Sequence, residues 1–434
     1  MIMGAWKEYR LGELGVVITG KTPSKDNPED WGNKMLFITP SDYKHYRKKA
    51  FFSERKLSLS GIERLRNKIL PKNSLLVTCI GSDMGKVVMN YEEAITNQQI
   101  NAIIPDNETV NNDFLYYRLV DLYEILAIYG GDGTAVPIVN KRDFENIETE
   151  IPPLSEQRAI AAVLSSLDDK IDLLRRQNVT LEKMAETLFR QWFVEEAKDV
   201  WEEKSLYNCI ELVGGGTPKT EKAEYWNGTI NWLSGGDIAG NHKNFVVFTE
   251  KTITDLGLNN SSAKLLPRYS TVVSARGTVG KYCLLARPMA FSQSNYGVLP
   301  KYKNCFFFTY LLLAHCIDEL LSAAYGSVFD TITTNTFKGI NIRLPNEKHI
   351  IIFEEKLTPY FKKMIRNQNQ INTLTQLRDT LLPKLMSGEV KVVSSHFSGD
   401  TGDPADTGHG RQGHHCPPTS YCEAGNLSDL RHCH

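Results

Sequence analysis

The chain has little of what marks a membrane, secreted or strongly charged protein. None of its apolar runs reaches the roughly 18 residues that cross a bilayer, and the N-terminus lacks a basic and then apolar secretion signal. We therefore expect a cytoplasmic protein without a membrane span. Its 50 Lys and Arg against 51 Asp and Glu give a formal net charge of −1. That balance argues against wrapping nucleic acid by bulk positive charge, but it leaves room for local basic patches.

The cysteines follow no disulfide or metal pattern. Five are scattered without a CxxC spacing and are typical of reduced thiols: Cys79, Cys209, Cys283, Cys305 and Cys316. Three more, Cys416, Cys422 and Cys433, lie among histidines, but their spacings fit no standard zinc finger. We expect no metal site. Residues 391–434 are rich in Gly, Asp, His, Pro and Ser, which predicts a disordered tail.

Catalytic motifs are missing as well. The segment 81–87, GSDMGKV, has three residues between its glycines and a Val after the Lys, whereas a phosphate-binding P-loop needs four and a Ser or Thr. A glycine turn leading into a strand is the preferred interpretation, and a turn that also meets a DNA phosphate is the alternative. The Asn/Asp-Pro-Pro-aromatic motif of base-amino methyltransferases is absent, and the ExK triplet Glu202–Lys204 is far in sequence from Pro105-Asp106. We expect no catalytic residues.

What the chain does have is a long amphipathic helix pattern. Residues 155–192 place core positions at alternating steps of four and three, the a/d pattern of a coiled-coil seam sustained for more than four heptads. Ser155 follows Ile-Pro-Pro and is positioned to cap the helix. The predicted seam residues are Ile160, Leu164, Leu167, Ile171, Leu174, Asn178 and Leu181. A seam of this length has to pack against a partner.

The partner is in the same chain. Adding 193 to the seam positions gives a second run with the same rhythm, from about 347 to 386. Its seam residues are Leu357, Tyr360, Met364, Asn367, Ile371 and Leu374. Two long helices packed as an antiparallel coiled coil about a pseudo-twofold axis are therefore predicted. An Asn on a seam lowers stability but fixes the register. We predict that Asn178 and Asn367 meet, with the centre near residue 176.

The segments before the two helices also repeat each other. Residues 201–344 match 1–151 at an offset of 195 to 196, with Trp6 matching Trp201 and Asp42 matching Asp237. Short β-like runs at 35–38, 74–78 and 100–104 and one helical run at 113–128 indicate an α+β globule. The predicted organisation is a tandem of two α/β domains and two helices. The boundaries are 1–151 for the first globule, 152–196 for the first helix, 197–345 for the second globule and 346–390 for the second helix.

The loop sequences of the two globules differ, as expected for two domains that recognise different targets. The run 43–49, YKHYRKK, is the strongest local nucleic-acid signal, because Lys can hold phosphates while Tyr, His and Arg can reach base edges. A solvated loop is the alternative. The DNA-binding candidates of the first globule are Lys21, Thr22, Ser24, Lys25, Ser41, Tyr43, Lys44, His45, Arg47, Lys86 and Gln98. Those of the second are Thr217, Lys219, Thr220, Lys243, Arg276, Thr278, Lys281, Gln293 and Asn295.

These features resemble the DNA specificity (S) subunit of type I restriction-modification systems, the HsdS family. The motifs that carry the resemblance are IPPLSEQR at 151–158, LFRQWF at 188–193, LLPKLMSGE at 381–389, GKTPS at 20–24 and GGTPK at 215–219. The resemblance covers residues 4 to about 392. The second copy departs from the pattern at 345–349, where the usual Pro-Leu-x-x-Gln-acidic sequence is eroded.

The resemblance implies that each globule is a target recognition domain reading half of a bipartite double-stranded DNA sequence. The helices would set the gap between the halves, and inserting about four residues, one turn, should lengthen it. Two modification (M) methyltransferase subunits would dock on the helices and flip the target adenine, and restriction (R) subunits would join them. The chain then needs no cofactor, since S-adenosylmethionine, ATP and magnesium belong to the partner subunits.

Three alternatives stay open. The chain is also compatible with an enzyme of unrecognised catalytic domain, with a scaffold whose two modules bind protein, and with a silent or phase-variable S protein. Unaided methylation or cleavage of DNA would favour the first. Loss of salt-dependent, sequence-preferring DNA binding in the full complex would favour the second. The target bases cannot be read from the sequence, because direct readout depends on loop geometry and DNA shape.

Overall fold

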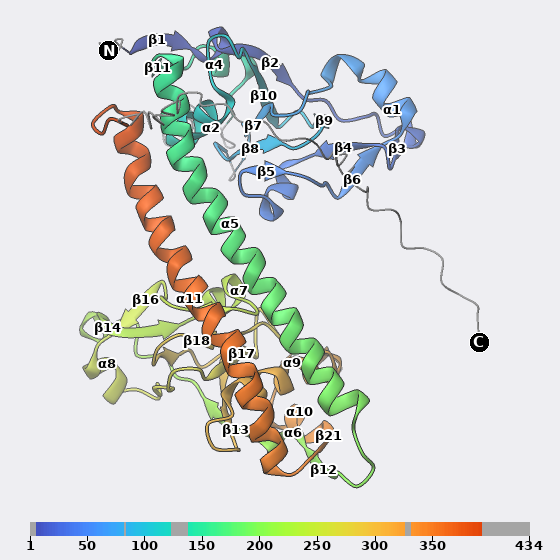
Figure 1. The fold of residues 1–434 in the computed structure, drawn as a ribbon, viewed down its shortest axis with the longest axis vertical. Helices are drawn as coiled ribbons and strands as arrows, with labels where there is room; N and C mark the ends of the chain where they lie inside the picture. The colour runs from blue at the N-terminus through green and yellow to red at the C-terminus, as the bar shows by residue number, and fades with distance from the viewer. Residues whose placement is uncertain (1–5, 82–83, 123–137, 326–330, 393–434) are drawn as a thin grey trace, which may run out of the picture. The chain divides into compact units, whose positions relative to one another are not determined.

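The computed structural model describes residues 6–81, 84–122, 138–325 and 331–392 (Figure 1). The predicted tail, apart from Lys391 and Val392, and the end of the helix predicted at 113–128 lie outside these residues. The described part forms one unit that contains two α+β globules and two long helices. Each globule is built on a five-stranded sheet, and the strand order is the same in both.

The first globule has its sheet strands in the order β2 (Gly15–Thr19), β10 (Ile100–Pro105), β7 (Leu75–Thr78), β8 (Val87–Asn90) and β5 (Lys49–Ala50). All pairs are antiparallel except β5 with β8. On β7, Leu75 and Val77 pack into one core cluster and Leu76 into another, as the alternation of side chains across a strand requires. The sheet therefore separates two apolar layers, which is why β7 is buried on both faces.

Smaller elements complete this globule. A second sheet has the order β3 (Trp31–Gly32), β6 (Arg55–Leu57), β4 (Met35–Ile38) and β9 (Ala94–Thr96), and β1 (Lys7–Arg10) pairs with β11 (Glu148–Ile151). The helices are α1 (Leu59–Arg64), α2 (Asn112–Asp121) and α4 (Lys141–Glu145). The side chain of Asn111 caps α2 by accepting the Phe114 N–H at 3.0 Å. The strands predicted at 35–38, 74–78 and 100–104 are confirmed.

The second globule repeats this topology. Its five-stranded sheet has the order β13 (Ile210–Gly214), β20 (Asn295–Pro300), β17 (Thr271–Ser274), β18 (Tyr282–Leu285) and β15 (Phe245–Val246). Its smaller sheet has the order β16 (Lys251–Ile253), β14 (Trp226–Leu233) and β19 (Ala290–Phe291), and β12 (Glu202–Ser205) pairs with β21 (Asn341–Leu344). Its helices are α6 (Leu206–Cys209), α7 (Gly235–Gly240), α8 (Asp255–Asn259), α9 (Phe306–Tyr325) and α10 (Thr334–Gly339). The duplication inferred from the 195-residue offset is thus visible in the strand order.

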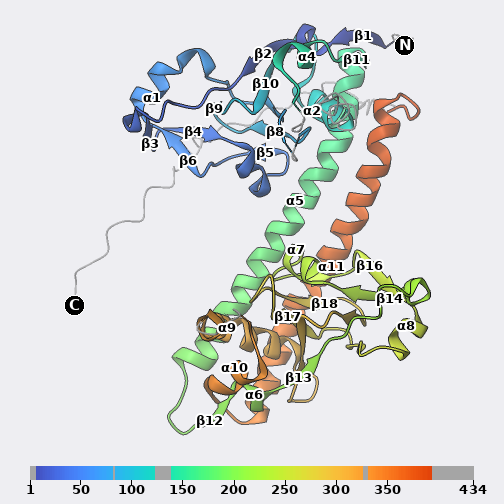
Figure 2. The same ribbon diagram turned by 180° about the vertical axis from the view of Figure 1, so that it is seen from behind.

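The two long helices are α5 (Leu154–Arg190), followed by a π-helical turn at 191–195, and α11 (Glu347–Met386). They lie side by side in both ribbon views (Figures 1 and 2). Asp168 contacts Arg378, Asn178 contacts Asn367 and Phe189 contacts Phe353, so one residue number rises as the other falls. The helices are antiparallel, and the predicted coiled-coil arrangement is confirmed.

The predicted seam residues lie at the helix interface with different degrees of burial. Four are half-buried: Leu167, Leu181, Tyr360 and Leu374. The other nine are buried: Ile160, Leu164, Ile171, Leu174, Asn178, Leu357, Met364, Asn367 and Ile371. Next to Tyr360, Phe361 is fully buried and its ring stacks on that of Phe307 in the second globule. At this position of α11, the Phe361 side chain packs against the second globule as well as against α5.

Two details of the sequence interpretation are wrong. Ser155 does not cap the first helix, because α5 begins at Leu154 and its N-cap is Pro153, which makes no side-chain cap bond. The expectation that no apolar stretch is long enough to cross a bilayer also fails. Helix α9, with 20 residues and a mean hydropathy of 1.4, passes that test by length and composition, but half of its apolar stretch is buried inside the protein. Phe308, Leu311 and Leu312 of α9 pack in the core of the second globule.

The C-terminal end of α11 belongs to the core of the first globule. Leu385 and Met386 are buried in the same cluster as Phe114 of α2. The guanidinium of Arg118 donates to the Met386 carbonyl at 3.1 Å, which fixes the end of the helix against α2. The chain therefore returns to its first globule after completing the second. The five described cysteines are buried free thiols, as predicted.

Candidate nucleic-acid interface

Two loops of the first globule that carry predicted DNA-binding residues lie against each other. The Thr22 hydroxyl donates to the side-chain carbonyl of Gln98 at 2.7 Å, although 76 positions separate the two residues. The close approach depends on Gly20, where a Cβ would lie 2.2 Å from the Asn97 carbonyl oxygen. Lys21, Ser24, Lys25 and Gln98 are exposed on these loops. The structure thus brings an amide that can read a base edge beside cations that can hold phosphates.

The basic run after β4 begins as the 3-10 helix η3 (Pro40–His45). The buried carboxylate of Asp42 accepts the N–H of Thr39 at 2.8 Å and the N–H of Glu54 at 2.9 Å. In the second globule Asp237 does the same for Ser234 and Glu250, at 2.9 and 3.1 Å. Asp42 and Asp237, which occupy matching positions of the repeat, therefore stabilise the same loop conformation in the two globules. Ser41, next to Asp42, is exposed.

Tyr43 does not face solvent, as a side chain that contacts a base would have to. It is 6% exposed, and its hydroxyl donates to the Leu76 carbonyl at 3.0 Å, which anchors η3 to the sheet. Burial raises the pKa of this phenol well above its ordinary value. Lys44 and His45 are exposed, but both face Glu54, at 3.1 and 3.6 Å. The hydrogen bond from Lys44 holds the pKa of Glu54 below its usual range. A DNA phosphate would have to compete with that carboxylate.

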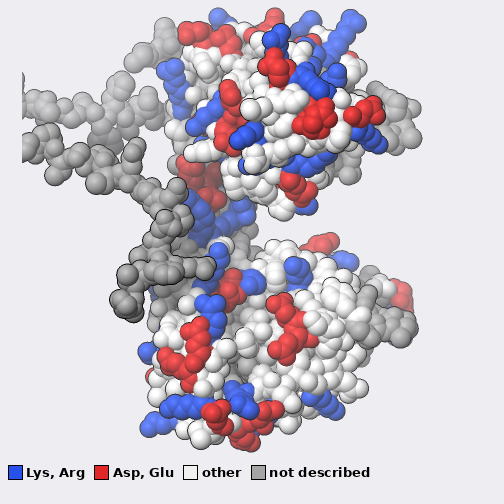
Figure 3. Space-filling view, turned by 90° about the vertical axis from the view of Figure 1, so that its right-hand side faces the viewer, with Lys and Arg blue, Asp and Glu red and all other residues white. Residues whose placement is uncertain are grey.

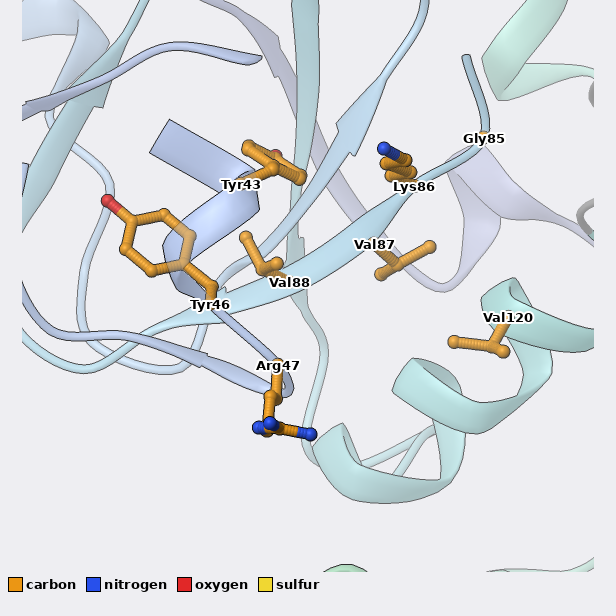
Figure 4. Close-up of a pocket in the computed structure, with 8 residues that line it drawn as sticks. All are labelled: Tyr43, Tyr46, Arg47, Gly85, Lys86, Val87, Val88 and Val120. Carbon is orange, nitrogen blue, oxygen red and sulfur yellow. The ribbon is translucent and has the colours of Figure 1, made fainter. Parts of the chain in front are cut away.

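Two predicted cations from different elements line one pocket of about 520 Å³. Figure 4 shows Arg47, just after η3, and Lys86, just before β8, around this pocket with Tyr43 and Tyr46. Lys86 follows a turn in which Gly81 and Gly85 have φ values of +87° and +85°. A strand, β8, begins at Val87, as the interpretation of 81–87 as a glycine turn leading into a strand predicts, although Ser82 and Asp83 lie outside the described residues.

The second globule presents its candidates on the matching hairpin between β17 and β18. Arg276 and Lys281 are exposed there, and Gly277 and Gly280 have φ values of +75° and +79°. The Thr278 hydroxyl donates to Ser274 at 3.0 Å. The loop of Thr217, Lys219 and Thr220 adjoins β19, because the Gly216 N–H donates to the Phe291 carbonyl at 2.9 Å. Lys219, Thr220 and Gln293 are exposed, and Thr217 is half-buried.

Two candidates of the second globule, Asn295 and Lys243, are engaged in contacts within the protein. Asn295 is 1% exposed and its amide donates to the Ser292 hydroxyl at 2.7 Å, so it holds the loop before β20 in place of facing solvent. The ammonium of Lys243 is 2.7 Å from the Glu186 carboxylate on α5. Partial burial works against the charge on Lys243, but the hydrogen bond to Glu186 outweighs it and the pKa of Lys243 is raised. Both side chains therefore make contacts that stabilise the fold.

Sequence reasoning missed the residues that fasten the globules to α5. Lys48, the counterpart of Lys243 at an offset of 195, lies 2.8 Å from both the Ser165 hydroxyl on α5 and the Asp113 carboxylate. The Tyr117 hydroxyl donates to Asp168 of α5 at 2.7 Å. The only sequence signal was the repeat itself, which relates Lys48 to Lys243. These contacts hold the globules against α5 and so orient the loops that carry the candidate residues relative to the helix pair.

Charge on the first globule is mixed. On the face shown in Figure 3, Lys and Arg of the first globule alternate with Asp and Glu, and the second globule shows a wider uncharged area. Among the described residues, no three His, Cys, Asp or Glu side chains form a group that could hold a metal ion. In the ExK triplet, Glu202 pairs with Lys204 at 2.7 Å on β12.

Two copies of one scaffold, each with exposed polar loops and each fastened to a shared helix pair, define a two-module recognition protein. The chain belongs to the type I restriction modification DNA specificity domain family, whose model matches it over residues 3–183 and again over 198–376. The two matches coincide with the two repeats.

Named relatives span nearly the whole chain. It is 27% identical over 412 residues to the type I restriction enzyme MjaIX specificity subunit of Methanocaldococcus jannaschii, covering 89% of this chain and 94% of that one. It is 22% identical over 471 residues to the type I restriction enzyme HindI specificity subunit of Haemophilus influenzae, covering 89% and 100%. The crystal structure of the type I restriction-modification S subunit from M. genitalium superposes with a TM-score of 0.56 at 16% identity, covering 88% and 96%. That likeness shows a shared fold.

Proposed function

We propose that this chain is the DNA specificity subunit of a type I restriction-modification complex and that each globule reads one half of a bipartite target. The observation that carries the proposal is the double family match, which falls on two globules whose five-stranded sheets have the same strand order and whose exposed loops differ. An identical scaffold with unlike loops is what two readers of unlike half-sites require, because the loops supply the base contacts.

Within each globule the exposed candidates divide by chemistry. Lys21, Lys25 and Lys86 in the first globule and Lys219 and Lys281 in the second would neutralise phosphates. Gln98, Arg276 and Gln293 would reach base edges, since Gln pairs bidentately with adenine and Arg with guanine. Tyr43, Lys243 and Asn295 would act indirectly, by holding the loops that carry the others.

The helix pair would set the gap between the two half-sites. Helix α5 has 37 residues and so is roughly 55 Å long at about 1.5 Å per residue. Both globules are fastened to it, the first through Asp168 and the second through Glu186. The distance between the readers then follows from residue count, and the number of unread base pairs follows from that distance.

The chemistry would belong to partner subunits. In this proposal the chain positions two modification subunits, which bind S-adenosylmethionine and flip the target adenine, and restriction subunits, which use ATP and magnesium. The chain itself carries out no catalytic step and holds no cofactor. Its near-neutral charge fits this role, because partner subunits that clamp the duplex would add phosphate contacts.

The proposal is tested by co-expressing the chain with the modification subunit encoded beside it and mapping methylated adenine across the host genome. A single split motif with two short specific halves and a fixed gap is expected. A stable complex that methylates nothing would contradict an active reader and point to a silent variant. Absence of any complex would contradict the assignment of the helices as a docking surface.

A domain exchange supplies the matched control. Replacing residues 1–151 with the first globule of another such protein should change one half of the motif and leave the other half and the gap unchanged. Replacing 201–344 should change only the other half. Simultaneous change of both halves in either exchange would show that the globules do not read independently.

A further inference from the structure

A pseudo-twofold axis relates α5 and α11, because a shift of 193 residues maps one helix onto the other. Each contact between the two helices therefore has a symmetry mate, which is the contact between the two equivalent residues on the other side of the centre. If each contact resembled its mate, either helix could pair with a second copy of itself as readily as with the other helix. The contacts are unlike their mates at three places along the seam.

The first place is the centre. The Asn367 amide donates to the Asn178 side-chain carbonyl at 2.9 Å, and the Asn178 amide donates to the Met364 carbonyl at 3.2 Å. Both asparagines are buried, at 1% and 4% exposure, and the predicted meeting of these amides is confirmed. The mate of this contact is Leu174 with Ile371, which lie together in a small apolar cluster. One side of the centre is polar and the other is apolar.

The second place lies farther along the seam, on the side of the first globule. There the Asp168 carboxylate accepts the Arg378 guanidinium at 2.8 Å, with 16% and 29% of the two side chains exposed. The mate of this ion pair is Ala185 with Phe361, both fully buried in the core of the second globule. Again one contact is ionic and its mate is apolar.

The third difference is between the two ends of the seam, where the packed side chains differ in size. Phe193 packs edge-on against Phe353 with ring centroids 4.8 Å apart, in the core of the second globule. The mate is Ile160 with Met386, in the core of the first globule. Two rings fill one end and two aliphatic side chains fill the other, so exchanging the helices would overfill one core and leave a cavity in the other.

We propose that these three differences make the pairing heterotypic, so that the seam of α5 fits α11 and rejects a second α5. Two copies of α5 would place Asn178 against Leu174 and Asp168 against Ala185. The Asn178 side-chain oxygen would then lose the amide of Asn367, and the Asp168 carboxylate would lose the Arg378 cation and keep only the Tyr117 hydroxyl, at a cost of roughly tenfold or more in association for each.

The same argument holds for α11. Two copies of it would place Asn367 against Ile371 and Arg378 against Phe361. The partner that each seam fits is therefore the seam of the other repeat, in the same chain or in another. This selectivity keeps two unlike globules together and excludes an assembly of two identical halves.

The test uses the full chain. A sequence-specific protease site is inserted between Asp199 and Val200, in a segment whose residues are all exposed. Two copies with different N-terminal tags are co-expressed with the protease, so that each chain is cut as it is made. Capture through one tag and native mass spectrometry then show what accompanies the N-terminal fragment. We expect C-terminal fragments, with fewer than about one in a hundred captured fragments paired with an N-terminal fragment of the other tag.

The key variant carries Asp168→Ala with Asn178→Leu, which removes both polar groups from the inner face of α5. It should raise homotypic pairing by at least about tenfold. The matched control is Asp169→Ala with Val179→Leu, changes to the same residue types one position along, where both side chains are exposed. The control should pair as the unmodified chain does.

Two results would overturn the proposal: homotypic pairs at their statistical share in the unmodified seam, or no difference between the inner-face variant and its control. If the inner-face variant is insoluble, Asn178→Leu alone decides the question, because it replaces the buried amide with an apolar side chain and leaves the contact of Tyr117 with Asp168 in place. It must raise homotypic pairing by about tenfold, and an unchanged share counts against the proposal.

Discussion

The hydroxyl of Tyr310 donates a hydrogen bond of 2.7 Å to the carboxylate of Glu182, and both side chains are buried between the second globule and α5. Tyr117, 193 residues earlier, makes the same contact with Asp168. A phenol–carboxylate pair thus fastens each globule to α5. Burial, the largest influence on Glu182, raises the pKa of its carboxyl to about 7.

This raised pKa predicts a pH-dependent stability. The folded-state pKa of Glu182 is about 7 and its ordinary value is 4.5, so the folded state binds the proton more tightly between these values. The free energy of unfolding should therefore fall as pH rises through this window and level off above it. Glu182→Gln should make the fall shallower by about 2 kcal/mol, measured by urea unfolding at pH 5, 6, 7 and 8. Glu211→Gln, at an exposed site, is the control, and parallel curves for the two variants would contradict this assignment.

Burial also raises the pKa of Glu354 to about 7, but this carboxylate has a different structural role. Its carboxylate on α11 accepts the N–H groups of Phe307 and Phe308 at 3.1 and 2.7 Å, which caps the first turn of α9. A Gln there keeps one acceptor and turns an NH₂ group toward the other N–H. Glu354→Gln should therefore destabilise the second globule by about 1 kcal/mol, and Glu354→Ala by about 2 kcal/mol.

Unfolding free energies and hydrogen-exchange protection of the Phe307 and Phe308 amides measure the effect of the Glu354 substitutions. The exposed neighbour Glu355→Ala should change neither. A Glu354→Gln variant that gains stability would show that the cap is not the role of this carboxylate.

Gln98 and Gln293 occupy matching, exposed positions of the two globules. If each reads a base edge, Gln98→Ala should relax one position of the first half-site, and Gln293→Ala one position of the second, by about 1–3 kcal/mol of discrimination. Each variant is the control for the other. Methylation mapping of the assembled complex reports both half-sites at once, and relaxation of both by a single substitution would contradict the assignment.

Lys86 should act through charge alone. Lys86→Ala is expected to weaken DNA binding of the assembled complex equally for all sequences and to lower the slope of log affinity against log salt by about 0.9. Lys141→Ala, on α4, removes the same charge from another element and should leave the slope unchanged. A changed base preference in the Lys86 variant would mean that this side chain reads bases.

The helix pair should behave as a ruler. Inserting seven residues after Arg175 in α5 and seven after Gln368 in α11, each continuing the a/d pattern, lengthens both helices by about 10 Å and keeps the seam in register. The gap in the methylated motif should grow by about three base pairs, since duplex DNA rises about 3.4 Å per base pair. Insertion into α5 alone displaces the partners Asp168 and Arg378 and should destabilise the pair. An unchanged gap in the double insertion would refute the ruler.

The repeat could be recognised from the sequence because it depends only on the spacing of residues along the chain. An offset of 193 between two seams and of 195 between two globules predicted the helix pair, its direction and the meeting of Asn178 with Asn367, all of which the structure contains. The loops at 21–25 and 276–281 could also be predicted, because Lys and Thr cluster there with Pro or Gly and without an apolar period.

The roles of single loop residues were not predictable in the same way. Tyr43 and Asn295 look like base readers by residue type, yet the first donates to a strand 33 positions away and the second is enclosed by its own loop. Lys243 is directed to Glu186, 57 positions earlier on a helix. No local pattern contains such partners.

The sequence by itself determined the duplication, the seam and the α+β character of each half, since periodicity and offset depend only on the order of residues. The tertiary structure alone decided which polar side chains face solvent and which fasten the globules to the helices. Burial and hydrogen bonding depend on residues that the fold brings together from distant parts of the chain, and for Tyr43, Lys243 and Glu354 those partners were visible only once the chain had folded.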